Sequence, residues 1–253
     1  LSIPFNISSI DSSSEVILNV NSGTDAMGNG KIEDLTFNGD GTKVYAVGFT
    51  GQMTVHSLST PYDLSNATVD ADDGINWTTA YASEGGSDSN HRIHGMRFNN
   101  DGTKMFLTDS FGTQGVIEYN LSTPYLPGSA SFGNFFAITE NGREIEDIDF
   151  DDDGTRMYVI ESKSGNPSSD KIYAYKLSTG FDTSTATFAG SMLNFFDAAG
   201  GDGGPGGMHF SEDGMKFYQV TFVTGYSDKN KVFEYDLSCP YGIVLCESET
   251  SSV

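Results

Sequence analysis

Acidic residues with the spacing of a calcium-binding loop occur at residues 149–154, DFDDDG. Three alternating aspartates before Gly154 are how the loop of an EF-hand begins, and carboxylate oxygens are the ligands that Ca²⁺ prefers. The bidentate acid of such a loop belongs at position 160, where the chain has Ile160, and Glu161 comes one residue late. The flanking segments also have the pattern of strands. We therefore interpret this segment as a hairpin turn, in which Asp caps backbone amides and Gly takes a positive φ.

A second group of charged residues stands in segments that alternate with large apolar side chains: Asp34, Arg97, Asp147, Asp149 and His209. Period-two alternation places these side chains on the face of a strand opposite to the apolar one. Two interpretations are open if the strands converge. The carboxylates of Asp34, Asp147 and Asp149 could hold a hard cation such as Ca²⁺. Alternatively, Arg97 could pair with these carboxylates and satisfy their buried charge.

Glu33, His94 and Glu146 lie directly before the same segments, and a histidine flanked by acids suggests general acid–base chemistry. The alternative is that they are surface polar residues. The sequence contains no G-x-S-x-G, Walker or H-E-x-x-H motif, so we assign no catalytic residue. The glycine-rich stretch at 198–210 lacks the strand–turn–helix setting of a phosphate-binding loop, and we interpret it as a connection between repeats.

The elements that must position these residues form a fourfold internal repeat. The Asp-Gly pair recurs at Gly41, Gly102, Gly154 and Gly214, at intervals of 61, 52 and 60 residues. A second anchor follows each one: HSLSTPYDLSNAT, YNLSTPYLPGSAS, YKLSTGFDTSTAT and YDLSCPYGIVL. Strand-like segments surround both anchors, and no helical pattern of useful length is visible. Four short antiparallel strands per repeat are typical of a propeller blade.

We therefore predict an all-β, four-bladed β-propeller of four-stranded antiparallel blades in a single domain, 1–253. The repeats are roughly 31–92, 93–144, 145–204 and 205–245, and residues 1–20 supply a strand that closes the last blade. The same strand could instead complete a blade of a neighbouring molecule. In this fold the five charged residues line the central channel, and Glu33, His94 and Glu146 lie at its mouth.

The phrase FNNDGTKMFLTD resembles the signature of YVTN and related Asp-Gly-Thr-Lys propeller repeats. The LSTPYD anchor is similar to a subgroup found in extracellular, cell-surface and phage-associated proteins of aquatic bacteria. The resemblance covers all four repeats. It implies a propeller fold and a location outside the cell or on a cell or virion surface, but no catalytic residue of lactonase-type propellers has a matching motif here.

Composition restricts the partners of the protein. The chain has 13 Lys and Arg against 35 Asp and Glu, a formal charge of −22, which argues against binding nucleic acid or anionic membranes. No apolar run is long enough to span a bilayer, which argues against membrane insertion. The chain begins without Met, and we expect a mature or excised fragment. Cys239 and Cys246 are predicted to form a disulfide that clips the C-terminal end.

Further candidate residues lie on loops and near the surface. Trp77 and Tyr81 stand in the longest connection, where they could contact a glycan or protein, or cover a blade edge. Glycosylation sequons occur at Asn6, Asn66, Asn76 and Asn120.

Together these patterns predict a non-enzymatic, extracellular structural or adhesive module that assembles with copies of itself or other surface proteins into an appendage or fibre. The alternatives are a calcium-dependent glycan-active or lactonase-like hydrolase, with Ca²⁺ as its cofactor, and a propeller that binds carbohydrate.

Overall fold

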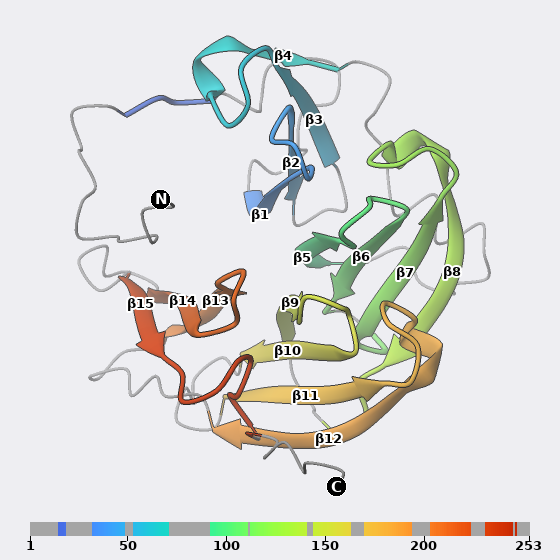
Figure 1. The fold of residues 1–253 in the computed structure, drawn as a ribbon, viewed down its shortest axis with the longest axis vertical. Helices are drawn as coiled ribbons and strands as arrows, with labels where there is room; N and C mark the ends of the chain where they lie inside the picture. The colour runs from blue at the N-terminus through green and yellow to red at the C-terminus, as the bar shows by residue number, and fades with distance from the viewer. Residues whose placement is uncertain are drawn as a thin grey trace, which may run out of the picture.

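The computed structural model describes residues 15–18, 32–48, 53–70, 92–110, 112–140, 144–162, 170–193, 203–223, 231–244 and 246. Within these ranges it is an all-β, four-bladed propeller, with four antiparallel sheets around one axis (Figure 1). No helix of the described residues is long and apolar enough to cross a membrane.

Each blade is a meander whose strands follow chain order from the axis outward. Blade 1 contains β1 (Ile32–Phe37), β2 (Lys43–Gly48), β3 (Met53–Leu58) and β4 (Ala67–Val69). Blade 2 contains β5 (Ile93–Phe98), β6 (Lys104–Asp109), β7 (Gly115–Leu121) and β8 (Ala130–Ala137). Blade 3 contains β9 (Glu144–Phe150), β10 (Arg156–Ser162), β11 (Lys171–Leu177) and β12 (Ala186–Leu193). Blade 4 contains β13 (Gly203–Phe210), β14 (Lys216–Val223) and β15 (Lys231–Asp236).

Blade 4 has three strands among the described residues. Of the segment predicted to close it, only residues 15–18 are described, and they belong to no strand. Leu18 packs instead against Ala46 of blade 1. The glycine-rich stretch differs from our expectation of a mere connection, because its second half is the inner strand β13, which pairs with β14.

The Asp-Gly turns are hairpins stabilised by local hydrogen bonds. In blade 2 the carboxylate of Asp101 accepts bonds from the Thr103 backbone amide at 3.0 Å and hydroxyl at 2.5 Å. These bonds hold the pKa of Asp101 below its ordinary value. Gly102 has φ = 70°, a conformation that side chains rarely adopt. The carboxylate of this turn therefore stabilises the turn by accepting its hydrogen bonds.

Each turn is covered by the aromatic residue of the LSTPY anchor in the same blade. Tyr125 donates its backbone N–H to the Gly102 carbonyl at 2.9 Å, and its ring lies where a Gly102 side chain would be. Tyr125 itself has φ = 58°, and the corresponding aromatics in the other blades also have positive φ. We call this pairing of a turn glycine with an anchor aromatic the turn lock, and it explains why both anchors recur together.

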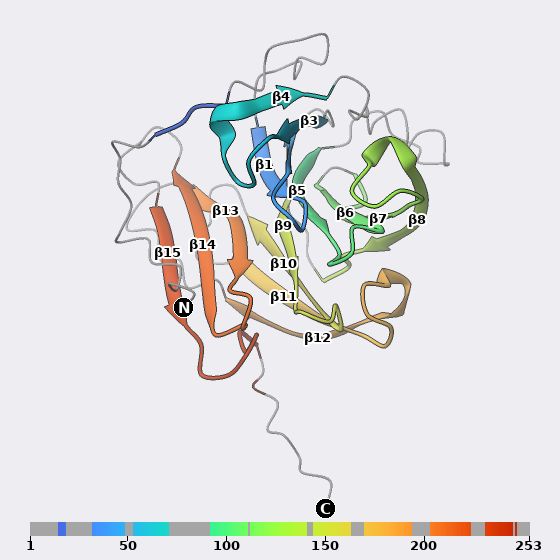
Figure 2. The same ribbon diagram turned by 45° about the horizontal axis from the view of Figure 1, so that its top comes forward.

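Apolar cores lie between consecutive blades. One joins blades 1 and 2, the next joins blades 2 and 3, and the third joins blades 3 and 4. Figure 2 shows the same sheets fanning out from the inner strands. The inner strands β1, β5, β9 and β13 thus stand around one axis and bring their inward side chains together.

Candidate functional site

The centre of the propeller is occupied by Arg97 of β5. Its guanidinium donates to Asp34 Oδ2 at 2.9 Å and to Asp147 Oδ2 at 3.0 Å, and its Nε lies 3.6 Å from Asp149 Oδ1. It also donates to the backbone carbonyls of Met96 at 2.7 Å and Met208 at 2.8 Å. One cation from blade 2 is thereby tied to three carboxylates from blades 1 and 3.

These carboxylates also join neighbouring inner strands. Asp34 accepts the backbone N–H of Met96, Asp147 accepts that of Met208, and Asp149 accepts that of Phe210. Each aspartate therefore bridges its own blade to the next one. Gly95 and Gly207 flank Asp147, and a side chain at Gly95 would overlap its carboxylate. Glycine at position 95 leaves the space that this carboxylate occupies.

Burial and charge act against each other in this axial cluster of Asp34, Arg97, Asp147, Asp149 and His209. Burial opposes the charged guanidinium, but the three carboxylates more than offset it and raise the pKa of Arg97. Burial raises the pKa of Asp147 well above its ordinary value although Arg97 opposes this change. The pKa of Asp34 is also raised by burial.

The predicted channel-lining residues are thus brought together, and the carboxylates face a guanidinium. No group of three or more metal-ligating side chains that could hold an ion is found among the described residues. Asp34 and Asp147 accept hydrogen bonds from Arg97 and from backbone amides. Asp149 accepts from backbone amides and lies 3.1 Å from His209 Nδ1. This is the arrangement of an ion-pair network.

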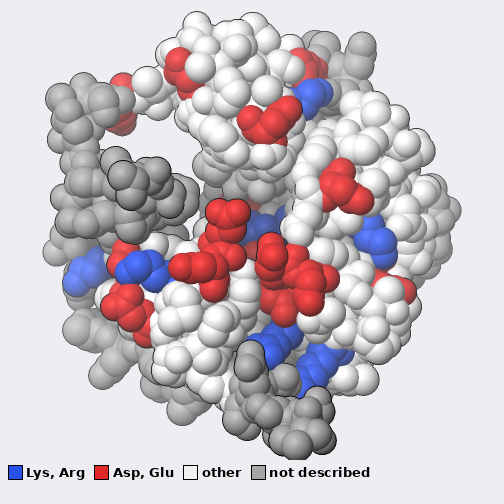
Figure 3. Space-filling view, viewed as in Figure 1, with Lys and Arg blue, Asp and Glu red and all other residues white. Residues whose placement is uncertain are grey.

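A cavity of about 820 Å³ opens above this cluster, on the side of the Asp-Gly turns. We call it the turn-side cavity. Its lining includes the anchor aromatics Tyr125, Phe181 and Tyr241 and the acids Asp151, Asp152 and Glu212. Figure 3 shows acidic side chains gathered around the axis on this face, with a basic group deeper at the centre. The aromatic lining was not assigned by the sequence reasoning, although the anchor motif contained its residues.

His209 stands at the base of the turn-side cavity with two-thirds of its side chain exposed (67%). Its Nδ1 lies 3.1 Å from Asp149 Oδ2, so Nδ1–H donates to the carboxylate when His209 is neutral and Nε2 is left as a base. Burial works against the Asp149 carboxylate, but the bond from His209 and the charge of Arg97 outweigh burial and lower the pKa of Asp149. A buried, ionised aspartate that orients an accessible histidine is a general-base arrangement.

His94 and Glu146, predicted at the channel mouth, meet at the other end of the inner strands. His94 Nδ1 lies 2.7 Å from Glu146 Oε2, and both side chains are buried. Burial disfavours the charged imidazole, but the bond to Glu146 and the charges of Glu146 and Glu33 more than offset it and raise the pKa of His94. Glu33 is half-buried on β1. This pair is a buried ion pair rather than an exposed base.

The remaining candidates are dispersed. Trp77, Tyr81, Asn6 and Asn76 lie outside the described residues. Asn66 is exposed at the end of the 3₁₀ helix η3 (Leu64–Asn66), and its amide bonds to Asp63. Asn120 is exposed on β7.

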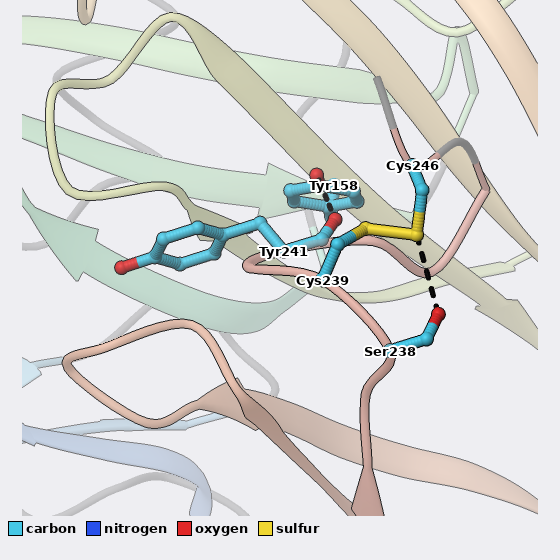
Figure 4. The surroundings of a disulfide bond; sticks show 5 residues. All are labelled: Tyr158, Ser238, Cys239, Tyr241 and Cys246. Atoms are coloured by element: carbon cyan, nitrogen blue, oxygen red, sulfur yellow. Dashed lines mark hydrogen bonds between the residues drawn. A yellow bond between two sulfur atoms is a disulfide. The ribbon is translucent and has the colours of Figure 1, made fainter. Parts of the chain in front are cut away.

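The predicted disulfide between Cys239 and Cys246 is present, with Cα atoms 5.7 Å apart (Figure 4). Cys239 lies within the anchor of blade 4, and two residues later the backbone carbonyl of Tyr241 accepts the Tyr158 hydroxyl of blade 3 at 2.6 Å. The covalent clip therefore closes over a segment that already joins two blades.

Comparisons with known proteins establish the fold. No family model and no curated protein match the sequence. A candidate 6-phosphogluconolactonase from Bacteroides fragilis shares 14% identity and a TM-score of 0.50, covering 83% of this chain and 56% of that one. The periplasmic gluconolactonase of Pseudomonas aeruginosa shares 14% identity with a TM-score of 0.46, covering 81% and 56%. A candidate 6-phosphogluconolactonase from Bacteroides uniformis shares 19% identity with a TM-score of 0.46, covering 79% and 55%.

This chain therefore spans little more than half the length of these solved propellers. At such identities the likeness shows the fold alone. It nevertheless runs against the prediction of a non-enzymatic structural or adhesive module, because a solved structure that shares the fold is a candidate 6-phosphogluconolactonase. That prediction, including the expectation that the chain is no enzyme, was wrong. Its physical weakness was to treat the absence of a nucleophile motif as the absence of catalysis, although hydrolysis by an activated water needs no nucleophilic side chain.

Proposed function

We propose that this protein is a lactonase-like hydrolase whose reaction takes place in the turn-side cavity. The observation that carries the proposal is the accessible His209, oriented by the buried Asp149 at the base of that cavity. The likeness of the fold to that of a candidate 6-phosphogluconolactonase also supports the proposal. The proposed reaction requires no metal ion.

In the reaction, His209 Nε2 takes a proton from a water molecule, and the water oxygen attacks the carbonyl carbon of a cyclic ester. The ring C–O bond then breaks, and the ring oxygen receives the proton from His209. The sum is one lactone and one water giving one hydroxy acid, which releases a proton to solution at neutral pH. Asp149 stays ionised throughout and stabilises the imidazolium, as its lowered pKa requires.

The walls of the cavity favour an uncharged sugar lactone. Aromatic faces such as those of Tyr125 and Tyr241 suit the C–H faces of a sugar ring, and the acids can accept hydrogen bonds from its hydroxyls. Asp152 and Glu212 repel a phosphate group, and the formal charge of −22 adds to this repulsion. We therefore expect glucono-δ-lactone to be preferred over its 6-phosphate.

The test is hydrolysis of both lactones, followed by proton release in a pH-stat, with His209→Gln and Asp149→Asn. The rate with His209→Gln should fall by about 10²–10⁴, the usual contribution of a general base. His94→Gln is the matched control, because it alters the histidine–acid pair at the other end of the channel. Circular dichroism must show that each variant is folded. The absence of hydrolysis above the uncatalysed rate, or full activity of His209→Gln, would refute the proposal, and selective loss in His94→Gln would move the site to the other mouth.

The finer assignments belong to the same proposal. We place the chain with the Asp-Gly-Thr-Lys propeller repeats on the phrase FNNDGTKMFLTD, and outside the cytoplasm on the disulfide and the acidic surface. A glycan ligand in the turn-side cavity is the second candidate, favoured by its aromatic lining. It predicts sugar binding without turnover.

A further inference from the structure

The three interfaces between consecutive blades use the same positions each time. We call the face of a blade that is turned to the next blade its forward face, and the opposite face its rear face. On the forward face of blade 1, Val47 and Met53 belong to one apolar cluster with Met96 of blade 2. Counting from the turn glycines, the equivalents of Val47 are Thr108 and Ile160, and those of Met96 are Ile148 and Met208. The equivalents of Met53 are Val116 and Ile172, because each pairs across the sheet with the equivalent of Val47. All of these side chains are at most 3% exposed. An inner-strand residue of one blade is thus always covered by the forward face of the blade before it.

The same positions are exposed where blade 4 should meet blade 1. Val220 and Val232, the forward residues of blade 4, are 46% and 51% exposed. Leu35, the inner-strand residue of blade 1, is 56% exposed. The inner strands of the other neighbouring blades pack along one another, whereas β13 and β1 make no comparable contact. The inner part of each end of the array therefore lacks the contact that the chain forms three times internally. Farther out on the rear face of blade 1, Val44, Ala46, Thr54 and His56 are at most 5% exposed, and Leu18 packs against Ala46.

A hydrogen bond that crosses two internal interfaces is also missing here. The Tyr45 hydroxyl donates to the backbone carbonyl of Tyr125 in the next blade at 2.6 Å. Tyr158 makes the same bond to Tyr241, also at 2.6 Å. The equivalent hydroxyl on blade 4, that of Tyr218, is buried and finds no partner among the described residues. Its counterpart acceptor would be the anchor tyrosine of blade 1, Tyr62, whose side chain is 60% exposed.

We infer that the open faces of blades 1 and 4 bind a second copy of this chain head to tail, so that two copies close one ring of eight blades. The surface complementary to Val220 and Val232 of blade 4 is the inner part of the rear face of blade 1 at Leu35, because Leu35 stands where Met96 stands in the first internal interface. Among the described residues, blade 1 of the same chain does not take this place, and blade 1 of a second copy offers the same surface. Two identical contacts then close the ring, and eight blades lie within the usual range for propellers.

Val220, Val232 and Leu35, the residues at the centre of the contact, are uncharged. Glu234 lies on the same face opposite Tyr218, and Lys216 pairs with it at 2.6 Å. In the dimer Tyr218 would donate to the partner's anchor segment, and Leu35 would be covered by valines of the partner. The inference concerns assembly and stands whether or not the hydrolase proposal holds.

The experiment is light scattering and native mass spectrometry of the 253-residue chain at 0.15 M salt, from 1 to about 100 μM, where charge repulsion is screened. The expected mass is twice the 27.2 kDa of one chain. Val232→Glu should give the single-chain mass throughout this range, because it places a charge in the centre of the interface. Val69→Glu is the matched control: Val69 is 44% exposed but lies on the outer strand β4, so this variant should remain dimeric.

A second variant protects the test against non-specific damage. Leu35→Lys combined with Val232→Glu places opposite charges on the two halves of each contact and should restore the dimer that Val232→Glu loses. A wild-type chain of single mass at 100 μM, a dimeric Val232→Glu variant, or species that grow beyond two copies would each overturn the inference.

Discussion

Replacing Arg97 by Met tests whether charge pairing holds the axis of the propeller together. The arginine side chain is 14% exposed and ties together Asp34, Asp147 and Asp149. Its removal leaves buried carboxylates without a cation. Breaking a buried ion pair by removing one partner costs about 3–5 kcal/mol. That is a large part of the stability of a typical domain, about 5–15 kcal/mol. We expect urea unfolding at pH 8 to show a loss of this size.

The stability lost with Arg97 should also depend on pH. The pKa values of Asp34 and Asp147 are already raised in the folded protein by burial, and without Arg97 they must rise further. A carboxyl whose pKa is higher in the folded state stabilises the fold below its unfolded pKa of about 4, and this contribution is lost as the pH rises through the folded pKa. The deficit of Arg97→Met should therefore shrink between pH 8 and pH 5.

Arg92→Met is the matched control. Arg92 is 37% exposed, and its guanidinium lies 3.5 Å from Glu144 Oε1, so its loss should cost about 0–1 kcal/mol. If Arg97→Met cost no more than Arg92→Met at pH 8, or if its deficit were equal at pH 5 and pH 8, the axial ion pairs would not be what holds the four inner strands together.

Three further outcomes are expected. Burial raises the pKa of Asp151 to about 6, so its contribution to folding is present below about pH 4 and lost as the pH rises through 6; Asp151→Asn should remove this dependence from the unfolding curves. Gly102→Ala should lower the free energy of unfolding by about 1–3 kcal/mol, because the positive φ and the overlying Tyr125 ring leave no room for a side chain. In Gly207→Ala the new Cβ would lie 3.5 Å from its nearest neighbour, Asp147 Oδ2, so this variant should unfold in urea almost as the wild type does. Replacing Cys239 and Cys246 by Ser should cost about 2 kcal/mol, with faster hydrogen exchange confined to blade 4 and its contact with blade 3.

Much of the fold could be predicted because its sequence signals are local and repeated. The turn at Gly102 and the anchor at Tyr125 recur in every blade, and period-two alternation alone places Arg97 and Asp147 on the axis. The residues of the axial cluster were predictable because fourfold repetition converts equal positions in sequence into neighbours in space.

The candidate catalytic residue was harder to predict from the sequence, because it depends on which of two histidines near an acid is exposed. His94 and His209 both stand near an acid in the propeller, yet one is buried in an ion pair and the other opens to a cavity. Exposure is set by side chains from other blades, such as the aromatic rim from Tyr241, and no local pattern encodes it. The state of Leu35 was hidden for the same reason: its pattern is that of a core residue, and only the arrangement of blades shows it uncovered.

The turn lock has a consequence for how such a chain can arise. Both of its halves, for example Gly154 and Phe181, belong to one blade, so a duplicated segment carries its own turn and the ring that covers it. Phe181 keeps the lock without a hydroxyl, which shows that the aromatic face alone is required. A gene that gains or loses whole repeats therefore keeps every turn lock intact. A crossover that falls between the glycine and the aromatic of one repeat preserves the turn lock only if it joins equivalent positions of two repeats. Blade number is for this reason the property that unequal recombination can change most readily.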